Sequence, residues 1–316
     1  MESAALASPA LIGLDWGTSS LRAYLIDGHG AVLGERDEPW GIMHLGDGDY
    51  VRACGDITVQ WPGVAALPVI ACGMVGSAHG WVETPYCPAP AGAAALAKSL
   101  TTVTGTNVHI VAGIAQHGDA DVMRGEETQI IGALSLHARL AQDARVVCPG
   151  THSKWVTVRN GDIAAFTTYM TGELFAVLSA HSILGRFARD TGMSDDSGTD
   201  AFRLGVRTAR DSKRDSAPLL FSARARVLLG ELQPEQSLDY LSGVLIGSEL
   251  RSGLTDHAAP TALIGAPALC ALYMQALREF DVPDVLVIDQ SAPRGLWQIA
   301  TAAGLFPSEV LATVRP

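Results

Sequence analysis

The sequence predicts an α/β protein with two related halves. The chain has 316 residues, which is about twice the length of a typical domain. A pattern of strand, Gly-Thr turn and strand occurs near the N-terminus and again near the middle of the chain. Elsewhere, short apolar segments typical of strands alternate with helical patterns, as in proteins built from α/β layers.

The composition predicts a folded and acidic protein. Apolar residues make up 48% of the chain, which is enough for a sizeable core and argues against disorder. The 22 Lys and Arg residues are outnumbered by 33 Asp and Glu residues, so the net charge is −11. Because the sequence also lacks basic clusters, neither nucleic acid nor an anionic membrane surface is expected as a partner.

The N-terminal segment and the cysteines predict a cytoplasmic protein. Met1–Ala10 lacks the positive charge with which a signal peptide begins. The longest apolar run, Val64–Val75, is interrupted by Pro68 and Gly73 and is too short to span a bilayer. The five cysteines are widely separated, which predicts reduced thiols rather than a zinc site or a set of disulfides.

The two copies of the repeat align without a gap. Three pairs of small residues coincide: Gly17 with Gly150, Thr18 with Thr151, and Ser20 with Ser153. In each copy two expected strands enclose the Gly-Thr turn, and a dipeptide that favours tight hairpin turns follows. These parts are Leu11–Leu14, Leu21–Ile26 and Asp27-Gly28 in the first copy, and Arg145–Cys148, Trp155–Arg159 and Asn160-Gly161 in the second.

Periodicity predicts the other elements. Apolar residues recur at helical spacing in four segments: Glu126–Ala141, Glu173–Leu184, Asp239–Leu250 and Pro267–Phe280. Four more segments are expected as strands: Pro68–Cys72, Asn107–Val111, Thr261–Ile264 and Val285–Ile288. Arg203–Arg226 is rich in charge and serine and is expected to be a surface segment between helices. Gly243 and Gly247, four residues apart, predict close packing of one helix on another.

A Gly-Thr turn between two strands suits a phosphate group. Glycine lets the backbone approach closely, and both N–H groups and hydroxyls can donate to phosphate oxygens. A structural hairpin explains one such turn equally well, but two related turns can grip a polyphosphate from both sides. Asp15 is a candidate Mg²⁺ ligand, through water, and Cys148 takes its place in the second copy. The sequence contains neither a P-loop nor a G-x-G-x-x-G motif.

These residues also carry a family resemblance. Asp15–Ser19, followed by Leu21–Ala23, resembles the first phosphate motif of the sugar kinase/Hsp70/actin superfamily, and the second copy resembles its second phosphate motif. A closer resemblance, to the 2-dehydro-3-deoxygalactonokinases, runs from Leu11 to about Ala302. The motifs that carry it are Ala71–Ser77, Gly80-Trp81, Asp121–Gln129, Cys148–Trp155 and Tyr169–Leu174, and the run Met123–Gln129 is the most specific.

The resemblance implies a function and a domain arrangement. The activity would be ATP-dependent phosphorylation of 2-dehydro-3-deoxy-D-galactonate on its 6-hydroxyl, with Mg²⁺, in galactonate catabolism. The fold would be α/β, with two actin-like, ribonuclease H-like domains and an interdomain cleft. Residues 1–142 would carry the first phosphate motif and the sugar-acid site, and residues 143–316 the second phosphate motif and the adenosine site. The alternatives are a kinase for another sugar or sugar acid and a non-catalytic, nucleotide-gated sensor; a homodimer is left open.

Two residues are the first candidates for catalysis, beside Asp15. Arg124 can hold the carboxylate of the sugar acid in a bidentate pair. Glu126 resembles, by its place after a glycine at a helix start, the Gly-Asp catalytic element of related sugar kinases, and is the candidate base. Asp119 and Asp121 compete for that role. A favourable interaction with the helix dipole explains the adjacent Glu pair without catalysis.

The expected binding residues belong to the turns and to one loop. The phosphate and nucleotide ligands would be Gly17, Thr18, Ser19, Gly150, Thr151, Ser153, Lys154 and Gly265. The sugar-acid contacts would be Gly73, Met74, Val75, Gly76, Ser77, Trp81 and Arg124. A strand-surface salt bridge explains Lys154 as well, and core packing explains Trp81. Gly265 precedes an expected helix, where the superfamily holds the adenosine, but the double glycine of that motif is missing.

Overall fold

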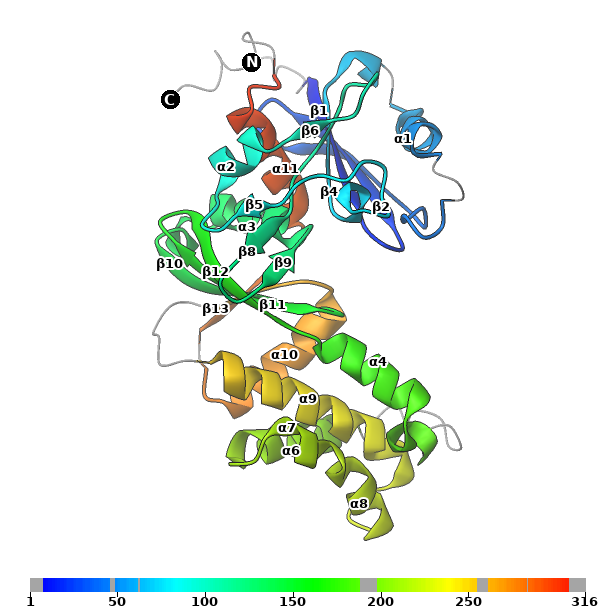
Figure 1. Cartoon of the computed structure of the whole chain (residues 1–316), viewed down its shortest axis with the longest axis vertical. Helices are drawn as coiled ribbons and strands as arrows, with labels where there is room; N and C mark the ends of the chain where they lie inside the picture. The colour runs from blue at the N-terminus through cyan, green and yellow to red at the C-terminus, as the bar shows by residue number, and fades with distance from the viewer. Residues whose placement is uncertain are drawn as a thin grey trace, which may run out of the picture. The chain divides into compact units, whose positions relative to one another are not determined.

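The computed structural model describes residues 8–45, 49–61, 63–187, 198–254, 261–282 and 284–306 (Figure 1). Contacts within the chain divide it into two compact units. Unit 1 contains Met1–Ala144, Val156–Phe166 and Gln290–Pro316, and unit 2 contains Arg145–Trp155 and Thr167–Asp289. The chain first leaves unit 1 close to the boundary expected after residue 142, whereas the two later segments of unit 1 have no signal in the sequence.

A six-stranded sheet forms the centre of unit 1. Its strand order is β3-β2-β1-β4-β7-β6, with β1 to β3 antiparallel and β1, β4 and β7 parallel. Its strands are β1 (Pro9–Trp16), β2 (Leu21–Asp27), β3 (Val32–Glu38), β4 (Val69–Cys72), β6 (Thr101–Thr102) and β7 (Val108–Ile110). β1 and β4 are buried along almost their whole length because they lie in the middle of the sheet under helical cover.

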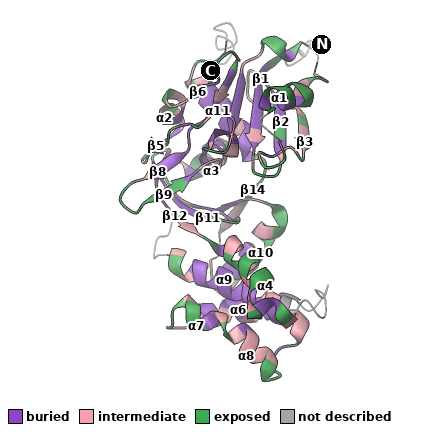
Figure 2. Ribbon diagram, turned by 45° about the vertical axis from the view of Figure 1, so that its right-hand side comes forward, coloured by how far each residue is buried: buried purple, intermediate pink, exposed green. Residues whose placement is uncertain are grey.

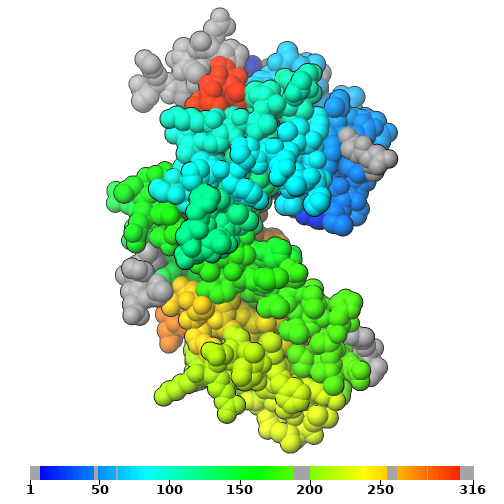
Figure 3. Space-filling model, in the orientation of Figure 1, coloured from blue at the N-terminus to red at the C-terminus, as the bar shows by residue number. Residues whose placement is uncertain are grey.

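A helix from the C-terminal end of the chain supplies that cover. Helix α11 (Ser291–Ala302) packs on β1 and on helix α3 (Glu126–Leu136). A Cβ on Gly132 would lie 1.9 Å from a backbone oxygen of α11, and one on Gly295 would lie 1.8 Å from a backbone oxygen of α3. The two helices therefore approach so closely that both positions require glycine. Figure 3 shows the C-terminal part of the chain that contains the end of α11, in red, beside the cyan residues of unit 1.

Short elements complete unit 1. They are helices α1 (Tyr50–Thr58) and α2 (Ala93–Lys98), the 3-10 helices η2 (Val64–Ala66), η3 (Met74–Gly76) and η4 (Ala138–Leu140), and a sheet of β5 (Cys87–Pro88), β8 (Ile114–Gln116) and β9 (Asp121–Met123) in the order β5-β8-β9. Because β9 ends at Met123 and α3 begins at Glu126, Arg124 and Gly125 form the whole connection between them.

A second sheet has five strands in the order β12-β11-β10-β13-β14. The strands are β10 (Asp143–Cys148), β11 (Ser153–Arg159), β12 (Asp162–Tyr169), β13 (Thr261–Ile264) and β14 (Val285–Ile288). β13 runs parallel to both β10 and β14. The bounds of β13 and β14 agree with the predicted strands, which are short apolar runs with clear turn residues around them.

The turns after the two phosphate hairpins differ from each other. Asn160 and Gly161 have φ values of 52° and 83°, so the tight hairpin turn expected there is confirmed. In the first copy, the carboxylate of Asp27 accepts hydrogen bonds from the backbone N–H of His29 and of Ala31. Gly30 N donates to Asp27 O at 3.1 Å and Gly30 is left-handed with a φ of 85°, so the tight turn expected at Asp27-Gly28 is present, with its left-handed residue at Gly30.

Helices form most of unit 2. They are α4 (Thr171–His181), α6 (Gly198–Asp211), α7 (Ser216–Leu220), α8 (Ser222–Leu228), α9 (Ser237–Gly253) and α10 (Pro267–Glu279), with the 3-10 helices η5 (Ile183–Gly185) and η6 (Pro234–Gln236). The central helix α9 is largely buried (Figure 2). A Cβ on Gly243 would lie 2.0 Å from Phe202 O, and one on Gly247 would lie 2.9 Å from Val206. The close helix packing expected from these glycines is therefore confirmed.

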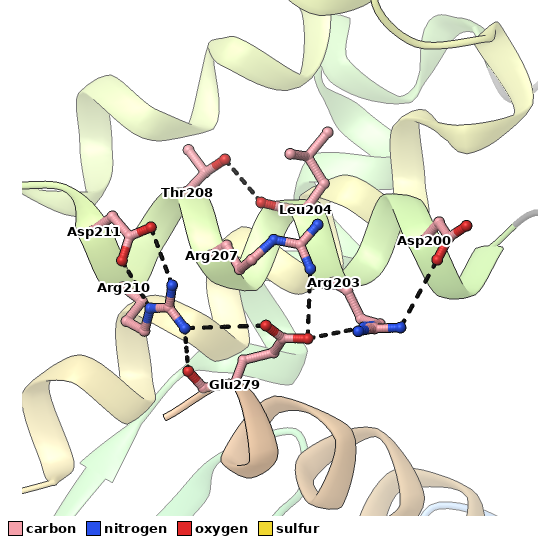
Figure 4. Close-up of polar contacts among 8 residues, drawn as sticks. All are labelled: Asp200, Arg203, Leu204, Arg207, Thr208, Arg210, Asp211 and Glu279. Atoms are coloured by element: carbon pink, nitrogen blue, oxygen red, sulfur yellow. Dashed lines mark hydrogen bonds and ion pairs between the residues drawn. The ribbon is translucent and has the colours of Figure 1, made fainter. Parts of the chain in front are cut away.

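The expectation of a surface segment between helices at Arg203–Arg226 is wrong, because most of it is helical. Its charged residues conceal an amphipathic pattern on α6, whose Phe202, Val206 and Ala209 are buried. Three arginines of α6 instead extend toward Glu279 at the end of α10 (Figure 4). Of these, Arg203 Nε lies 2.8 Å from Glu279 Oε1. The hydrogen bond from Arg203 is the main reason why the pKa of Glu279 is lowered.

The other predicted helices are present with shifted ends. α3 stops at Leu136 rather than at Ala141, because His137 has an extended φ of −132°, and η4 follows. α4, α9 and α10 agree with the predictions to within a few residues. In the part of the chain that the structure describes, every helix is too short or too polar to cross a bilayer.

Candidate active site

The first Gly-Thr turn is held from two sides. Gly17 N donates to Ser20 O at 2.9 Å, which closes the turn between β1 and β2. The backbone N–H of Met43 donates to Thr18 O at 3.1 Å. A Cβ on Gly41 would lie 2.3 Å from the backbone of Ser19, so this second segment presses directly on the turn. Thr18 and Ser19 remain exposed, as side chains that donate to a ligand must be.

Asp15 lies two residues before this turn and pairs in register with Cys72 of β4. The Cys72 thiol donates to Asp15 Oδ1 at 3.9 Å. Burial raises the pKa of Asp15, and the charge of Arg22 opposes that shift. A thiol is a weak donor, so a cation would stabilise this carboxylate better than the Cys72 thiol does. Asp15 therefore fits a Mg²⁺ ion.

The described residues hold no cluster of three or more His, Cys, Asp or Glu side chains that could bind a metal. A site with a single carboxylate still suits Mg²⁺, which keeps several waters and takes oxygens from substrate phosphates. Cys148, in the position equivalent to Asp15, is 4% exposed at the end of β10. The two turns therefore differ in this one ligand.

The loop after β4 lies close to the backbone of β1. Gly73 has a φ of 92°, and a Cβ there would lie 2.7 Å from Trp16 O. The next residues form η3, in which Val75 and Gly76 are buried and Met74 is half-buried. Ser77 Oγ is buried without a hydrogen-bond partner among the described residues. The loop thus combines a tight backbone with one unsatisfied hydroxyl.

Trp81 belongs to an aromatic cluster of the core. Its ring stacks on Tyr50, with centroids 5.7 Å apart and planes at 8°, and it meets Trp16 edge to face at 6.2 Å. It also lines a cavity of about 270 Å³ beside α1. Its place in the structure agrees with the core-packing interpretation of its role.

Arg124 is fixed by two residues of one segment. Its Nη1 donates to Thr84 Oγ1, and its Nη2 donates to Thr84 O at 3.0 Å. The guanidinium carbon lies 4.4 Å from the centroid of the Tyr86 ring, which is a cation–π contact. A Cβ on Gly76 would lie 2.9 Å from Arg124 Nη1, so the guanidinium also borders the loop after β4. Within the described residues, Arg124 Nε is buried without a hydrogen-bond partner.

Two adjacent carboxylates occupy the start of α3. Glu126 Oε2 accepts a hydrogen bond from Arg124 N at 3.2 Å, and Glu127 Oε2 accepts one from Gly125 N at 2.6 Å. Both contacts satisfy backbone N–H groups ahead of the helix, which is compatible with the interaction with the helix dipole that was expected as the alternative to catalysis. Glu126 is half-buried, whereas Glu127 is fully buried, and burial raises the pKa of Glu127 to about 7.

The two competing aspartates lie around β9. Asp119, in the connection between β8 and β9, is exposed and accepts a hydrogen bond from Gln116 Nε2 at 3.0 Å. Asp121, the first residue of β9, accepts from Val122 N at 2.7 Å. Neither side chain is buried.

The second Gly-Thr turn lies in unit 2, between β10 and β11, and contacts the start of α4. A Cβ on Gly172 would lie 2.5 Å from Gly150 O, and Glu173 N donates to Thr151 O at 3.0 Å. The imidazole of His152 contacts the carboxylate of Glu173. These contacts fix the turn while leaving the side chain of Thr151 exposed.

Ser153 and Lys154 face inward from the beginning of β11. Ser153 is fully buried, and its hydroxyl donates to Glu249 Oε1 at 2.7 Å. Lys154 is 6% exposed, and its Nζ donates to Thr168 Oγ1 at 2.7 Å. Neither side chain is therefore exposed. The contact between the Lys154 ammonium and Thr168 is a buried hydrogen bond to a hydroxyl, whereas the alternative for this residue was a salt bridge on the strand surface.

An apolar cavity of about 430 Å³ lies next to the second turn, within unit 2. It is lined by residues from the turn, α4, α9 and α10, among them Gly150, Thr151, Thr171, Phe175, Ile246, Leu269 and Tyr273. Ala266 also lines it, whereas a Cβ on Gly265 would lie 3.2 Å from Pro149 O. A cavity of this size with a mainly apolar lining suits a nucleoside.

The candidate residues thus fall into two sets. Asp15, Gly17, Thr18, Ser19, Gly73 to Ser77, Trp81, Arg124 and Glu126 belong to unit 1, and Gly150, Thr151, Ser153, Lys154 and Gly265 belong to unit 2. Three residues that contact members of these sets were not predicted from the sequence: Thr84 and Tyr86, which contact Arg124, and Glu249, which accepts from Ser153. Glu249, an acidic residue within the apolar part of α9, was the one visible signal, whereas Thr84 and Tyr86 lie in an irregular segment.

Comparisons with known proteins place these features in a family. A family model described as 2-keto-3-deoxy-galactonokinase matches residues 15–299. The 2-dehydro-3-deoxygalactonokinase of Escherichia coli (strain K12) is 36% identical over 92% of this chain and 97% of its own. The probable 2-dehydro-3-deoxygalactonokinase of Rhizobium meliloti (strain 1021) is 36% identical over 84% of this chain and 87% of its own.

A solved structure agrees with these matches. The crystal structure of a putative 2-dehydro-3-deoxygalactonokinase from Sinorhizobium meliloti has 33% sequence identity and a TM-score of 0.83, and the match covers 93% of this chain and 98% of that one. The expected α/β, actin-like fold is thereby confirmed. Because a family model and relatives above 30% identity both match most of its length, the chain belongs to the 2-keto-3-deoxy-galactonokinase family of carbohydrate kinases.

Proposed function

We propose that this protein phosphorylates 2-dehydro-3-deoxy-D-galactonate on its 6-hydroxyl, with ATP as the donor, in galactonate catabolism. Family membership supports the reaction class. The observation that carries the substrate class is the guanidinium of Arg124, which Thr84 and Tyr86 fix beside the loop after β4. A fixed planar guanidinium is the group that best recognises a carboxylate.

The nucleotide would be held by both Gly-Thr turns. Gly17, Thr18 and Ser19 would donate to phosphate oxygens from the first turn, and Gly150 and Thr151 from the second. The adenosine would occupy the 430 Å³ cavity, near the Gly265-Ala266 connection. Ser153 and Lys154 would support the second turn from the interior of the fold, since both side chains are buried. They donate hydrogen bonds to Glu249 and Thr168.

Asp15 would hold Mg²⁺, directly or through water. When bound, the ion neutralises charge on the phosphates of the nucleotide. The partial burial of Asp15, which raises the pKa of its carboxyl, favours a cation beside it. Backbone N–H groups, this ion and a few placed cations such as Arg124 would together offset the net charge of −11 against two anionic substrates.

The sugar acid would bind to Gly73, Met74, Val75, Gly76 and Ser77, with Trp81 behind them and Arg124 on its carboxylate. Ser77 Oγ and Arg124 Nε are buried without hydrogen-bond partners among the described residues, which supports polar contacts that a ligand completes. Glu126 would accept the proton of the 6-hydroxyl as that oxygen attacks the γ-phosphorus and ADP leaves.

The domain assignment is part of this proposal. Residues 1–142 would supply the sugar-acid site and the metal ligand, and residues 143–316 the adenosine site. A cytoplasmic location is also proposed, and the five free cysteines support it because disulfides are rare in that compartment.

A coupled assay of ADP release tests the proposed function. With ATP and Mg²⁺, we expect turnover with 2-dehydro-3-deoxy-D-galactonate and little with its C4 epimer or with neutral sugars. Equal or faster turnover with another sugar acid would replace the substrate and keep the reaction. ATP binding without turnover on any sugar acid would favour the nucleotide-gated sensor.

A further inference from the structure

A buried carboxylate stands at the centre of unit 2. Glu249, on α9, is 2% exposed and accepts hydrogen bonds from four side chains. All four donors are neutral: the hydroxyls of Ser153, Thr171 and Tyr273 and the indole N–H of Trp155. A buried carboxylate costs free energy unless such donors replace water, and here they satisfy both of its oxygens.

The two oxygens serve different parts of the structure. Oε1 accepts from Ser153 Oγ at 2.7 Å and from Trp155 Nε1 at 2.6 Å, both on β11 directly after the second Gly-Thr turn. Oε2 accepts from Tyr273 OH at 2.7 Å and from Thr171 Oγ1. Thr171 and Tyr273 line the 430 Å³ cavity, whereas Ser153 and Trp155 do not. Glu249 therefore bridges the strand behind the turn and the wall of the cavity.

The start of α4 extends this bridge to the turn itself. Thr171 is the first residue of α4, and Gly172 packs on the backbone of Gly150 and Thr151. Glu173 N donates to Thr151 O at 3.0 Å. A change in the bond between Glu249 and Thr171 would therefore displace the backbone that surrounds Thr151.

The proton positions of this network are also defined. Burial, together with the adjacent Glu249, raises the pKa of Tyr273, so its hydroxyl keeps its proton and donates. The indole N–H of Trp155 can only donate. Tyr273 OH also lies 3.3 Å from Ser153 Oγ, so two of the hydroxyls contact each other as well as Glu249, and the network joins β11, α9 and α10.

We propose that Glu249 is the positioning residue of the nucleotide site, which sets the second Gly-Thr turn and the cavity wall in the geometry that binds ATP. This inference rests on the proposed function in taking ATP as the ligand of that cavity. Glu249 contacts neither substrate, so its effect is expected on nucleotide affinity and not on the sugar acid.

Substitution by glutamine tests the bridge with little change in volume. Because Trp155 can only donate, the amide oxygen of Glu249→Gln must face Trp155 and Ser153. The amide NH₂ then faces Thr171 and Tyr273, whose hydroxyls must reverse to accept. The β11 side of the bridge is kept, and the cavity side is altered.

The experiment titrates the full chain with the magnesium complex of a non-hydrolysable ATP analogue by calorimetry, beside steady-state kinetics. We expect the dissociation constant of the analogue and the KM for ATP to rise about tenfold in Glu249→Gln, a size typical of altered charge-assisted hydrogen bonds. The KM for the sugar acid should stay within about twofold of wild type. Ser248→Ala is the matched control, since Ser248 is the neighbouring buried residue of α9 and its hydroxyl has no partner among the described residues.

A second pair of variants keeps the test informative if Glu249→Gln does not fold. Thr171→Val removes one donor at nearly constant volume and should raise the dissociation constant of the analogue about threefold or more. Thr171→Ser keeps the hydroxyl and should restore affinity close to wild type.

The outcomes separate the two proposals. Folded Glu249→Gln and Thr171→Val proteins with wild-type affinity for the analogue, or equal rises in the KM of both substrates, would overturn the role of Glu249 alone. Wild-type protein that binds the analogue but prefers another sugar acid would overturn the proposed substrate and leave this inference standing. Wild-type protein that binds no analogue would overturn both.

Discussion

The guanidinium of Arg124 lies over the ring of Tyr86, with its carbon 4.4 Å from the ring centroid. Thr84 binds the same guanidinium through its hydroxyl and its carbonyl, and the Thr84 hydroxyl in turn donates to Gly76 O at 3.2 Å. Each terminal nitrogen of arginine carries two N–H groups, so these bonds leave donors for a ligand. Thr84 thus links the proposed carboxylate-binding residue to the proposed sugar-acid loop.

Thr84→Val should weaken binding of the sugar acid. Thr84 is 1% exposed, so valine fills the same space but removes the hydroxyl that accepts from Arg124 Nη1 and donates to Gly76 O. We expect the KM for the sugar acid to rise about tenfold, as for a lost charge-assisted hydrogen bond, while the KM for ATP is unchanged. Thr84→Ser, which keeps the hydroxyl, should behave as wild type. An unchanged KM in a folded Thr84→Val protein would exclude this link.

Arg124→Lys should lose most activity although the charge is kept. Lysine can stay over Tyr86, but it lacks the planar fork that pairs with a carboxylate and with Thr84 at the same time. We expect kcat/KM for the sugar acid to fall about a hundredfold, measured by initial rates at low substrate concentration. The KM for ATP should be far less affected, and equal rises in the KM of both substrates would contradict a carboxylate-binding role.

Glu126→Gln distinguishes catalysis from capping. Glutamine still accepts the hydrogen bond from Arg124 N, so the start of α3 should keep its structure. If Glu126 is the base, turnover falls by roughly 10² to 10⁴ with unchanged ATP binding. Wild-type turnover in this variant would assign Glu126 to capping, and Asp119→Asn and Asp121→Asn would then be the next variants to assay.

Asp15→Asn should weaken the dependence on Mg²⁺ without disturbing the fold. Asparagine retains an oxygen that can accept from the Cys72 thiol but removes the negative charge that a divalent cation needs. We expect the Mg²⁺ concentration for half-maximal rate to rise about tenfold or more, measured at a fixed concentration of ATP. An unchanged Mg²⁺ titration would show that Asp15 does not hold the ion.

The sequence predicted local structure well and tertiary contacts poorly. β13, β14 and α9 follow from short apolar runs and a helical period, and the Asn160-Gly161 turn follows from its dipeptide. In contrast, the bond between Arg124 and Thr84 joins residues 40 positions apart, and the bond between Ser153 and Glu249 joins residues 96 positions apart. Local patterns carry no record of such pairs.

The prediction of a surface segment at Arg203–Arg226 was wrong because the many charged residues obscured the apolar face of a helix. The Arg and Asp residues of α6 obscured Phe202, Val206 and Ala209, which recur at helical spacing and are buried. The phosphate turns show a similar limit. The repeat marks Ser153 as a candidate phosphate ligand, but only the tertiary structure shows that its hydroxyl donates to Glu249.

Glu127 should make the stability of the protein depend on pH. Burial raises its pKa from 4.5 to about 7, with the charge of Glu126 as the next contribution. Between these values the native state binds more protons than the unfolded state, so the free energy of unfolding falls as the pH rises. Below pH 4.5 both states are protonated and the penalty is absent, and above pH 7 it is complete, at up to about 3 kcal/mol.

Glu127→Gln isolates this effect, because its amide oxygen can still accept from Gly125 N and its NH₂ can face Thr128 Oγ1. We expect urea unfolding at pH 5 to give similar stabilities for variant and wild type. At pH 8 the variant should be the more stable of the two, since it buries no charge beside Glu126. A stability difference that is the same at both pH values would mean that Glu127 keeps an ordinary pKa and that the hydrogen bonds from Gly125 and Thr128 offset the whole cost of its burial.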